Sequence, residues 1–379
     1  MDLTLTDDQQ LIQSTARDVL RAWAGSAGAR AVRDGRDGPG HSTRLWKEMV
    51  ELGWTGLAVP ESYGGVGEGF LEVCLLIEEM GAAQVPGPFL STVACAAPAI
   101  ARFGTQAQRT EWLGAIAAGR SVGYLRGAPR GGWGATRSTL GARAAGGGYV
   151  LDGTALFVPW AAAVDGFLAV AETDAGLTAF LLEATSAGRT VEPLDVVGPD
   201  RQYLVRLDGV EVPGGAVLGE VGGGERVVEL ADAHGAAASC AEMVGGAQRV
   251  LDLTVEYAGQ RQQFGRPIGA FQAVQHHCAD MASDVLGSRL IAYEAIWRLS
   301  AGVDSPREVA LTGAAAKAWV SDAYQRVCAL GQQVHGAVGF TAEHDLHLYT
   351  THATSTALRF GDGDFHTDRV ASAIGLPDS

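Results

Sequence analysis

Strand-type sequence is confined to the middle third of this 379-residue chain, and that confinement limits the possible folds more than any other feature. From about residue 119 to 220, short β-type runs recur between turn residues, at 149–151, 155–158, 166–170, 177–182 and 203–207. The sequence on either side carries helical periodicity instead. The order predicts a mostly helical α+β protein with an N-terminal helical domain (1–118), a middle β-domain (119–222) and a C-terminal helical domain (223–379).

The N-terminal third has clear helix signals. Thr6-Asp-Asp-Gln9 has the spacing of a capping box and precedes an apolar run. Apolar residues then recur at helical spacing over 45–52, 71–80 and 91–103, with Gly- and Pro-containing loops between these segments. The sequence therefore predicts several short helices here.

Two long helical runs in the last third meet at a sharp turn. Residues 236–257 contain no proline, a second run opens at Phe271-Gln272, and Gly265 to Gly269 form the turn between them. Arg261 and Phe264 are expected one helical turn apart just before it. A guanidinium matches phosphate oxygens in a planar fork, so this turn is a candidate clamp for a phosphorylated cofactor. The alternative is a surface hairpin with solvated arginines.

Charge and cysteine usage restrict the partners and the compartment. A formal charge of −15 argues against nucleic acid or an anionic membrane surface, which require a basic face. The start of the chain lacks a secretory signal, and no window approaches a membrane span. The cysteines sit singly in apolar segments, as is typical of reduced core residues in a cytoplasmic protein. They are Cys74, Cys95, Cys240, Cys278 and Cys328.

Three long segments resemble motifs of the acyl-CoA dehydrogenase family, in the family's order and spacing: 52–65, 257–281 and 333–343. The resemblance implies an N-terminal helical domain, a middle β-barrel-like domain and a C-terminal four-helix bundle. It also implies FAD as cofactor and an acyl-CoA substrate, which is oxidised to the 2-enoyl-CoA. In that reaction a carboxylate removes the α-proton and the β-hydrogen leaves as hydride to the flavin. Family members form dimers or tetramers in which each flavin lies between two subunits.

The half of the flavin site that each chain lends to its neighbour is well preserved. By resemblance, Arg261 binds pyrophosphate, Gln263 and Phe264 line the cofactor, and Gln272 faces the adenine end. Gln333, Gly336 and Ala337 form a backbone cradle that needs small residues. Ala337 replaces a family glycine.

The half that each chain contributes to its own flavin is altered. The family's loop with flavin-binding hydroxyls aligns with residues 124–134, where both hydroxyls are lost. The replaced positions hold Gly127, Ala128 and Trp133, and the retained ones hold Pro129 and Gly132. On the next strand Phe157 keeps an aromatic ring that could stack on flavin, whereas Pro159 replaces a threonine and offers neither hydroxyl nor N–H.

The catalytic base expected from the family is missing. Its two alternative positions hold Phe360, followed by a glycine, and Gly235. Four acidic residues are weak substitutes, because each is also explained by a solvated turn or an exposed helix face. They are Asp362, Asp364, Asp232 and Glu242.

The histidines do not indicate a metal site. His335, His344, His347 and His352 are better explained as packed or solvated residues, and the last three lack a fourth ligand or a recognisable metal motif. The sequence predicts no metal centre.

The asymmetry between the two half-sites favours one hypothesis. Uniform decay would erode both halves, so we expect an acyl-CoA dehydrogenase subunit that works with a second family member in a hetero-oligomer. Two alternatives stay open: a homo-oligomeric flavin monooxygenase or N-hydroxylase, which needs no such base, and a non-catalytic scaffold subunit.

Overall fold

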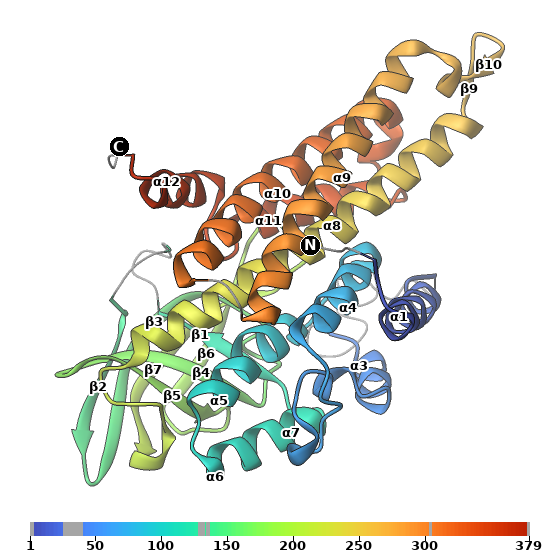
Figure 1. The fold of residues 1–379 in the computed structure, drawn as a ribbon. Coiled ribbons are helices and arrows are strands. Elements are labelled where there is room, and N and C mark those ends of the chain that lie inside the picture. Colours follow the sequence, from blue (N-terminus) through green and yellow to red (C-terminus); the bar gives the residue numbers. More distant parts are fainter. Residues whose placement is uncertain (1–3, 26–40, 128–132, 134–136, 303–304, 377–379) are drawn as a thin grey trace.

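The structure, a computed structural model, describes residues 4–25, 41–127, 133, 137–302 and 305–376. Short helices from the N-terminal third and a central sheet lie on one side of the molecule, and long C-terminal helices extend away from them (Figure 1). The predicted fold, mostly helical with a central sheet and a C-terminal helical domain, is confirmed. None of the described helices is long and apolar enough to cross a membrane.

The N-terminal helices form largely where the sequence predicts them. The Thr6 capping box is present, since the Gln9 amide donates to Thr6 Oγ1 at 3.3 Å and the Thr6 amide donates to Gln9 Oε1 at 3.0 Å. The predicted helix over 91–103 is divided, because Pro98 lacks an N–H and disturbs the α-helical ladder; the Ala97 amide donates to Thr92 O, five residues back. The helical elements are α1 (Asp7–Gly25), α3 (Thr43–Glu51), α4 (Phe70–Ala83), the π-helix Ser91–Ala96, α5 (Ala97–Phe103), α6 (Gln106–Gln108), the π-helix Arg109–Leu113 and α7 (Gly114–Ala117).

The middle segment forms, within the described residues, one eight-stranded sheet. Its strands are β1 (Val122–Leu125), β2 (Leu140–Ala145), β3 (Gly148–Pro159), β4 (Gly166–Thr173), β5 (Gly176–Glu183), β6 (Arg189–Leu194), β7 (Gln202–Pro213) and β8 (Val217–Leu218). The order is β6-β7-β3-β2-β4-β5-β8, and β1 pairs with β4. The two runs predicted at 149–151 and 155–158 belong to one strand, β3. The sequence did not indicate β1, β2, β6 or β8, because these strands form through pairing with neighbours rather than through strong intrinsic preference.

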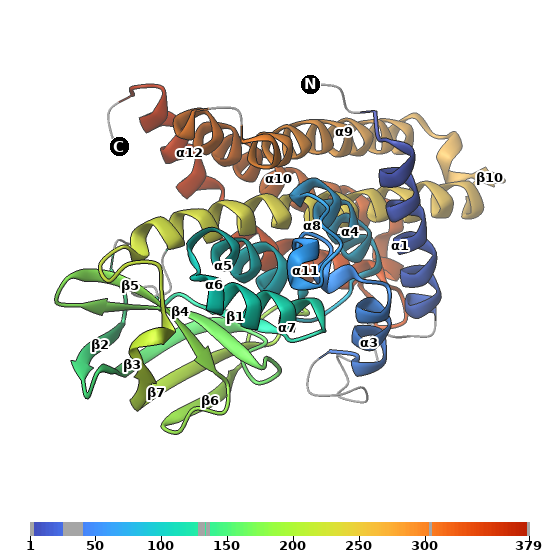
Figure 2. The same cartoon turned by 60° about the horizontal axis from the view of Figure 1, so that its bottom comes forward.

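Long helices dominate the C-terminal part. They are α8 (Gly224–Gln260), α9 (Gln272–Ala301), α10 (Pro306–His335), α11 (Leu346–Leu358) and α12 (Gly363–Ala373). Figure 2 shows α8, α9 and α10 running along one another above the sheet and the N-terminal helices. Fully buried Met243, Val250, Met281 and Tyr324 pack in the core between these helices. The α8–α9 turn therefore lies at the end of the bundle that is distant from the sheet (Figure 1).

The α8–α9 turn is not helical up to Phe264. Helix α8 ends at Gln260, and the chain forms a small hairpin of β9 (Gln262–Gln263) and β10 (Arg266–Pro267). Phe264 and Gly265 connect the strands with φ values of 53° and 80°, the positive pair that two-residue hairpins favour. The expectation that Arg261 and Phe264 lie one helical turn apart was therefore wrong, because the helix ends before both.

Candidate functional site

The hairpin arm, residues 261–267, projects from the end of the bundle and is exposed along its whole length. Phe264 at its tip is 91% exposed, and its left-handed backbone is unusual for an aromatic residue. Arg266 covers the Phe271 ring at 4.2 Å from its centroid. An exposed aromatic tip beside Arg261 offers both a stacking surface and a phosphate-binding cation to another molecule.

The second preserved motif lies at the same end of the bundle. Buried His335 closes α10 and stacks on Tyr257, near the end of α8, with 4.4 Å between ring centroids. Its Nδ1 lies 2.8 Å from the Gly331 carbonyl, so it donates there. Gln333, Gly336 and Ala337 are exposed beside this stack. Exposed Gln272 opens α9 directly after the arm. The structure thus brings the predicted residues of the lent half to one end of the molecule.

A pocket near the sheet end of α8 is lined by described residues of the half-site that the chain was predicted to contribute to its own flavin. It has a volume of about 580 Å³ and lies between β3, the β6–β7 connection and the α11–α12 turn. Phe157 lines it, half exposed, at a bulge of β3 where φ is 56°. Phe360 lines the same pocket.

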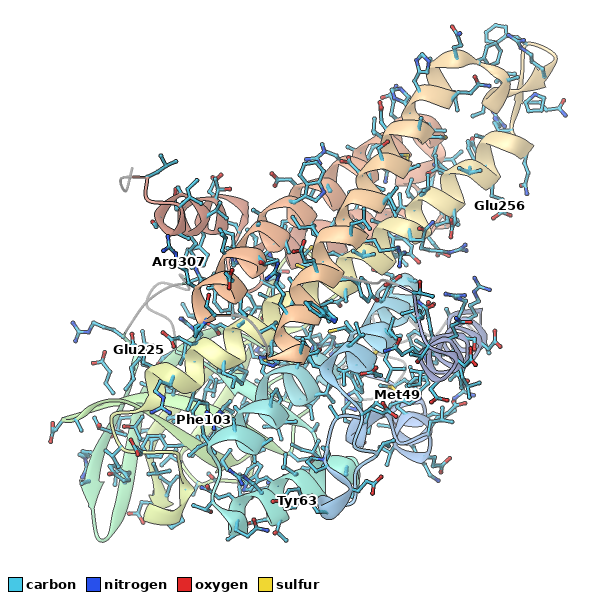
Figure 3. All side chains as sticks on the ribbon, in the orientation of Figure 1. Met49, Tyr63, Phe103, Glu225, Glu256 and Arg307 are labelled. Atoms are coloured by element: carbon cyan, nitrogen blue, oxygen red, sulfur yellow. The ribbon has the colours of Figure 1, made fainter. Side chains whose placement is uncertain are left out.

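The arm cannot reach this pocket within one chain. Gly235 touches the pocket wall, and Arg261 follows it by 26 residues of almost continuous helix, roughly 39 Å at about 1.5 Å per residue. Figure 3 labels Glu225 and Glu256, which mark the two ends of α8, beside the sheet and beside the arm respectively. The arm and the pocket of one chain are therefore too far apart to form a single site.

The described residues of the chain's own half do not fit a flavin held in the family's manner. Gly127 has φ 62°, and a Cβ there would lie 2.6 Å from Ser138 Oγ, so a threonine would strain the backbone and force Ser138 to shift. The Trp133 indole donates to the Leu358 carbonyl at 3.0 Å and lies against the Phe360 ring, 5.4 Å between centroids. An aromatic pair thus stands where the resemblance predicts a phosphate-binding serine. Ala128, Pro129 and Gly132 lie outside the described residues.

The two possible base positions are in contact with each other. A Cβ on Gly235 would lie 2.4 Å from two ring carbons of Phe360, which is buried. The Phe360 ring therefore fills the space into which a side chain at residue 235 would project. Neither position supplies a carboxylate, and the Phe360 ring occupies the space at both of them.

Four groups fix the Phe360 turn, whose backbone is strained with φ 59°. Lys317, fully buried, donates through Nζ to the carbonyls of Ala357 at 2.9 Å and Gly361 at 2.8 Å. Burial lowers the pKa of Lys317 to about 8, so its ammonium persists at neutral pH. Burial also lowers the pKa of His366 to about 4, and its neutral ring donates through Nε2 to the Phe360 carbonyl at 2.8 Å. The third group is Trp133, whose indole donates to the Leu358 carbonyl. The fourth is Arg359, which pairs with Asp200 and Glu242.

Replacing Gly235 by alanine should destabilise the protein through a clash with the Phe360 ring, by about 1–3 kcal/mol. In a Phe360→Ala background the same replacement should cost much less, because the ring is gone. Thermal denaturation of the four variants of this cycle measures the coupling. Gly259→Ala, on the same helix with no neighbouring atom within 4 Å of the added Cβ, is the control and should be neutral or slightly stabilising. Equal costs of Gly235→Ala in both backgrounds would contradict the contact.

Two of the four acidic candidates are already engaged. Asp232 accepts from Tyr124 Oη and Arg126 Nε, both at 3.0 Å, and is not among the residues that line the pocket. Burial raises the pKa of Asp232, although Arg126 and Tyr124 oppose that shift. Glu242 accepts from Arg359 at 2.8 Å and from His352 at 3.2 Å. Burial alone would raise the pKa of Glu242, but Arg359 and His352 lower it to about 2, which makes this carboxylate a very weak base.

The other two candidates lie at the α11–α12 turn. Asp362 borders the pocket but caps α12, since its Oδ1 accepts from the Phe365 amide at 2.8 Å. Asp364 is exposed in the first turn of α12 and does not line the pocket. The geometry therefore gives neither an obvious catalytic position.

Glu242→Gln should reduce stability at neutral pH by about 3 kcal/mol, because it removes one partner of a partly buried ion pair. The folded carboxyl has a pKa of about 2 and the ordinary value is 4.5. Its contribution is therefore complete above pH 4.5 and is lost as the pH falls towards 2. Melting temperatures measured between about pH 7 and pH 3 should converge for wild type and variant. Glu229→Gln, an exposed position on the same helix, serves as control; a constant gap between wild type and Glu242→Gln across this range speaks against the assignment.

Sequence reasoning did not identify Lys317, Arg126 or Arg359 as part of this site. Lys317 occupies a core position in the helical repeat of α10. A charged residue at such a position could have indicated from the sequence that Lys317 has a special role. Arg359 directly precedes Phe360 and also pairs with Asp200 at 2.5 Å. Among the described residues, no group of three or more His, Cys, Asp or Glu side chains is placed to hold a metal ion.

Family comparisons identify this architecture as that of acyl-CoA dehydrogenases. The model of the N-terminal domain of acyl-CoA dehydrogenase matches residues 6–120, and the model of the C-terminal domain matches residues 222–375. The chain belongs to the acyl-CoA dehydrogenase family.

Individual relatives agree with this assignment. The acyl-CoA dehydrogenase FadE27 of Mycobacterium tuberculosis is 34% identical over 335 residues, which cover 87% of each chain. The butyryl-CoA dehydrogenase structure from Megasphaera elsdenii superimposes with a TM-score of 0.89 at 28% identity, covering 99% of this chain and 100% of that chain. A chain of the ChsE4-ChsE5 complex from Mycobacterium tuberculosis superimposes with a TM-score of 0.90 at 29% identity, over 100% of both chains.

Proposed function

We propose that this protein is a subunit of an FAD-dependent acyl-CoA dehydrogenase that works only together with a second family member. The observation that carries the proposal is the contrast between its two half-sites. The arm with Arg261 and Phe264 is exposed, whereas in the wall of the chain's own pocket Phe360 and Trp133 stand where the resemblance predicts a base and a phosphate ligand. The structural similarity to a chain of a two-protein complex supports the same conclusion.

In this proposal the chain's residues act on a flavin whose other half-site belongs to the partner. Arg261 would bind the pyrophosphate, Phe264 and Gln263 would cover the cofactor, and Gln272 would face the adenine end. Gln333, Gly336 and Ala337 would approach it through backbone groups. Bound FAD supplies the hydride acceptor for α,β-dehydrogenation of an acyl-CoA thioester, and the partner supplies the carboxylate base.

Flavin content tests the proposal directly. The chain is purified alone and after co-expression with a family member that retains the hydroxyl-bearing loop and the base, and the visible spectrum is recorded. We expect no stoichiometric flavin in the chain alone, and flavin together with acyl-CoA oxidation in the complex. Stoichiometric flavin and robust dehydrogenation by the chain alone would refute the proposal. Reductase-dependent oxygen consumption by the chain alone would instead favour a flavin monooxygenase.

A further inference from the structure

We propose that the 580 Å³ pocket of this chain is a binding site for an uncharged, flat, apolar molecule rather than for a flavin. This inference goes beyond the proposed function, which uses the arm and needs nothing to bind in this pocket. It starts from the mismatch between the pocket and a phosphorylated cofactor.

The walls of the pocket are mainly apolar and remain open to a ligand. Aromatic residues form much of the surface, and the mouth carries exposed apolar side chains. Leu156 is 40% exposed, Phe157 52%, Leu358 59% and Val197 70%. The volume lies within the range of small-molecule sites, about 300–1,000 Å³. Exposed apolar groups around a concavity of this size are typical of a ligand site.

The cationic groups that line the pocket are already paired with carboxylates. Its two guanidiniums belong to Arg126 and Arg359. Arg126 pairs with Asp232 at 3.0 Å, and Arg359 pairs with Asp200 at 2.5 Å and Glu242 at 2.8 Å. A phosphate or carboxylate entering the pocket would compete with carboxylates already in place and would lose its hydration. An uncharged ligand avoids both costs.

The flat shape follows from the aromatic walls and their rigidity. Phe157 projects from a strained bulge, and Trp133 and Phe360 lie against each other with an interplanar angle of 39°. The ties from Lys317, His366 and Arg359 hold the Phe360 turn, so this wall is already ordered before a ligand arrives. A preformed wall lowers the entropy cost of binding, and a planar ring system gains most from stacking on it.

Two matched probes test this inference on the full chain, alone and in the assembled complex. N-phenyl-1-naphthylamine is uncharged and carries a planar naphthalene ring, and 1-anilinonaphthalene-8-sulfonate has the same ring system with one added sulfonate. Fluorescence titration should show saturable binding of the uncharged probe, at least about tenfold tighter than that of the sulfonate. Val197→Trp, at the exposed mouth, should weaken binding of the uncharged probe at least about tenfold by filling the entrance.

A second concavity supplies the control variant. An open groove of about 880 Å³ borders α6 and the β2–β3 turn, and Val221 lines it with 46% of its surface exposed. Val221→Trp should leave binding of the uncharged probe unchanged. The inference is overturned if the uncharged probe does not saturate, if the sulfonate binds equally well, or if Val197→Trp has no more effect than Val221→Trp. These results are independent of flavin content, so a failure here is distinguishable from failure of the proposed function.

Discussion

Replacing Arg261 by alanine in the assembled complex is expected to weaken FAD binding about ten- to hundredfold, because a hydrogen bond to a charged group contributes about 1.5–3 kcal/mol. Arg261 is exposed on the arm in the isolated chain, so the replacement removes little from this chain's own fold. The fluorescence of released flavin during equilibrium dialysis of the complex measures the affinity. A scaffold subunit predicts unchanged affinity.

Arg266→Ala is the matched control for this experiment. It removes the same charge from the same hairpin, but its guanidinium lies over the chain's own Phe271 ring. We expect a smaller loss of FAD affinity than with Arg261→Ala. Equal losses in both variants would indicate a general electrostatic effect of the arm, and the specific role of Arg261 would be withdrawn.

Gly245→Ala is expected to destabilise the fold by at least about 3 kcal/mol. Helices α4 and α8 cross so closely that a Cβ at this position would lie 1.8 Å from the Glu78 carbonyl oxygen and 3.0 Å from the Ala82 nitrogen. Backbone atoms cannot move aside as a flexible side chain can, so the helices must separate. The melting temperature of the purified chain reports the effect.

A different helical glycine separates this clash from general effects of glycine replacement. Gly313, on α10, has no atom within 4 Å of an added Cβ and needs no positive φ. Gly313→Ala should raise stability slightly, by about 0.5–1 kcal/mol, because alanine is the better helix former. If the Gly245 and Gly313 variants melt alike, the close crossing of α4 and α8 is not as tight as the structure has it.

A site that is shared between two chains would explain why the pocket of this chain is altered. An enzyme that assembles one active site from two chains needs only one intact arm and one intact pocket at that site. In the proposed hetero-oligomer the second pocket would then be free of catalytic constraint, and its residues could change without loss of activity. In this chain Phe360 and Trp133 lie against each other in the wall of that pocket, while its apolar mouth stays open.

Much of the fold could be predicted because its signals are local. Capping at Thr6, helical periodicity and turn residues each depend on neighbours a few positions away in the sequence, and the structure agrees with them. Strands β2 and β6 were missed because pairing across the sheet decides them. The expected helical spacing of Arg261 and Phe264 was wrong, since both lie after the end of α8 in a hairpin that helical spacing cannot distinguish from another helical turn.

The sequence by itself determined which residues this chain has kept and lost: an arm with Arg261 and Phe264, a pocket with Trp133 and Pro159, and no carboxylate at residues 235 or 360. Only the tertiary structure decided how these positions relate. It places Phe360 against Gly235, sets Glu242 between Arg359 and His352, and separates the arm from the pocket by the length of α8. The physical reason is that contacts between residues far apart in the sequence depend on how helices cross and turns close, and those arrangements follow from packing of the whole chain rather than from any local pattern.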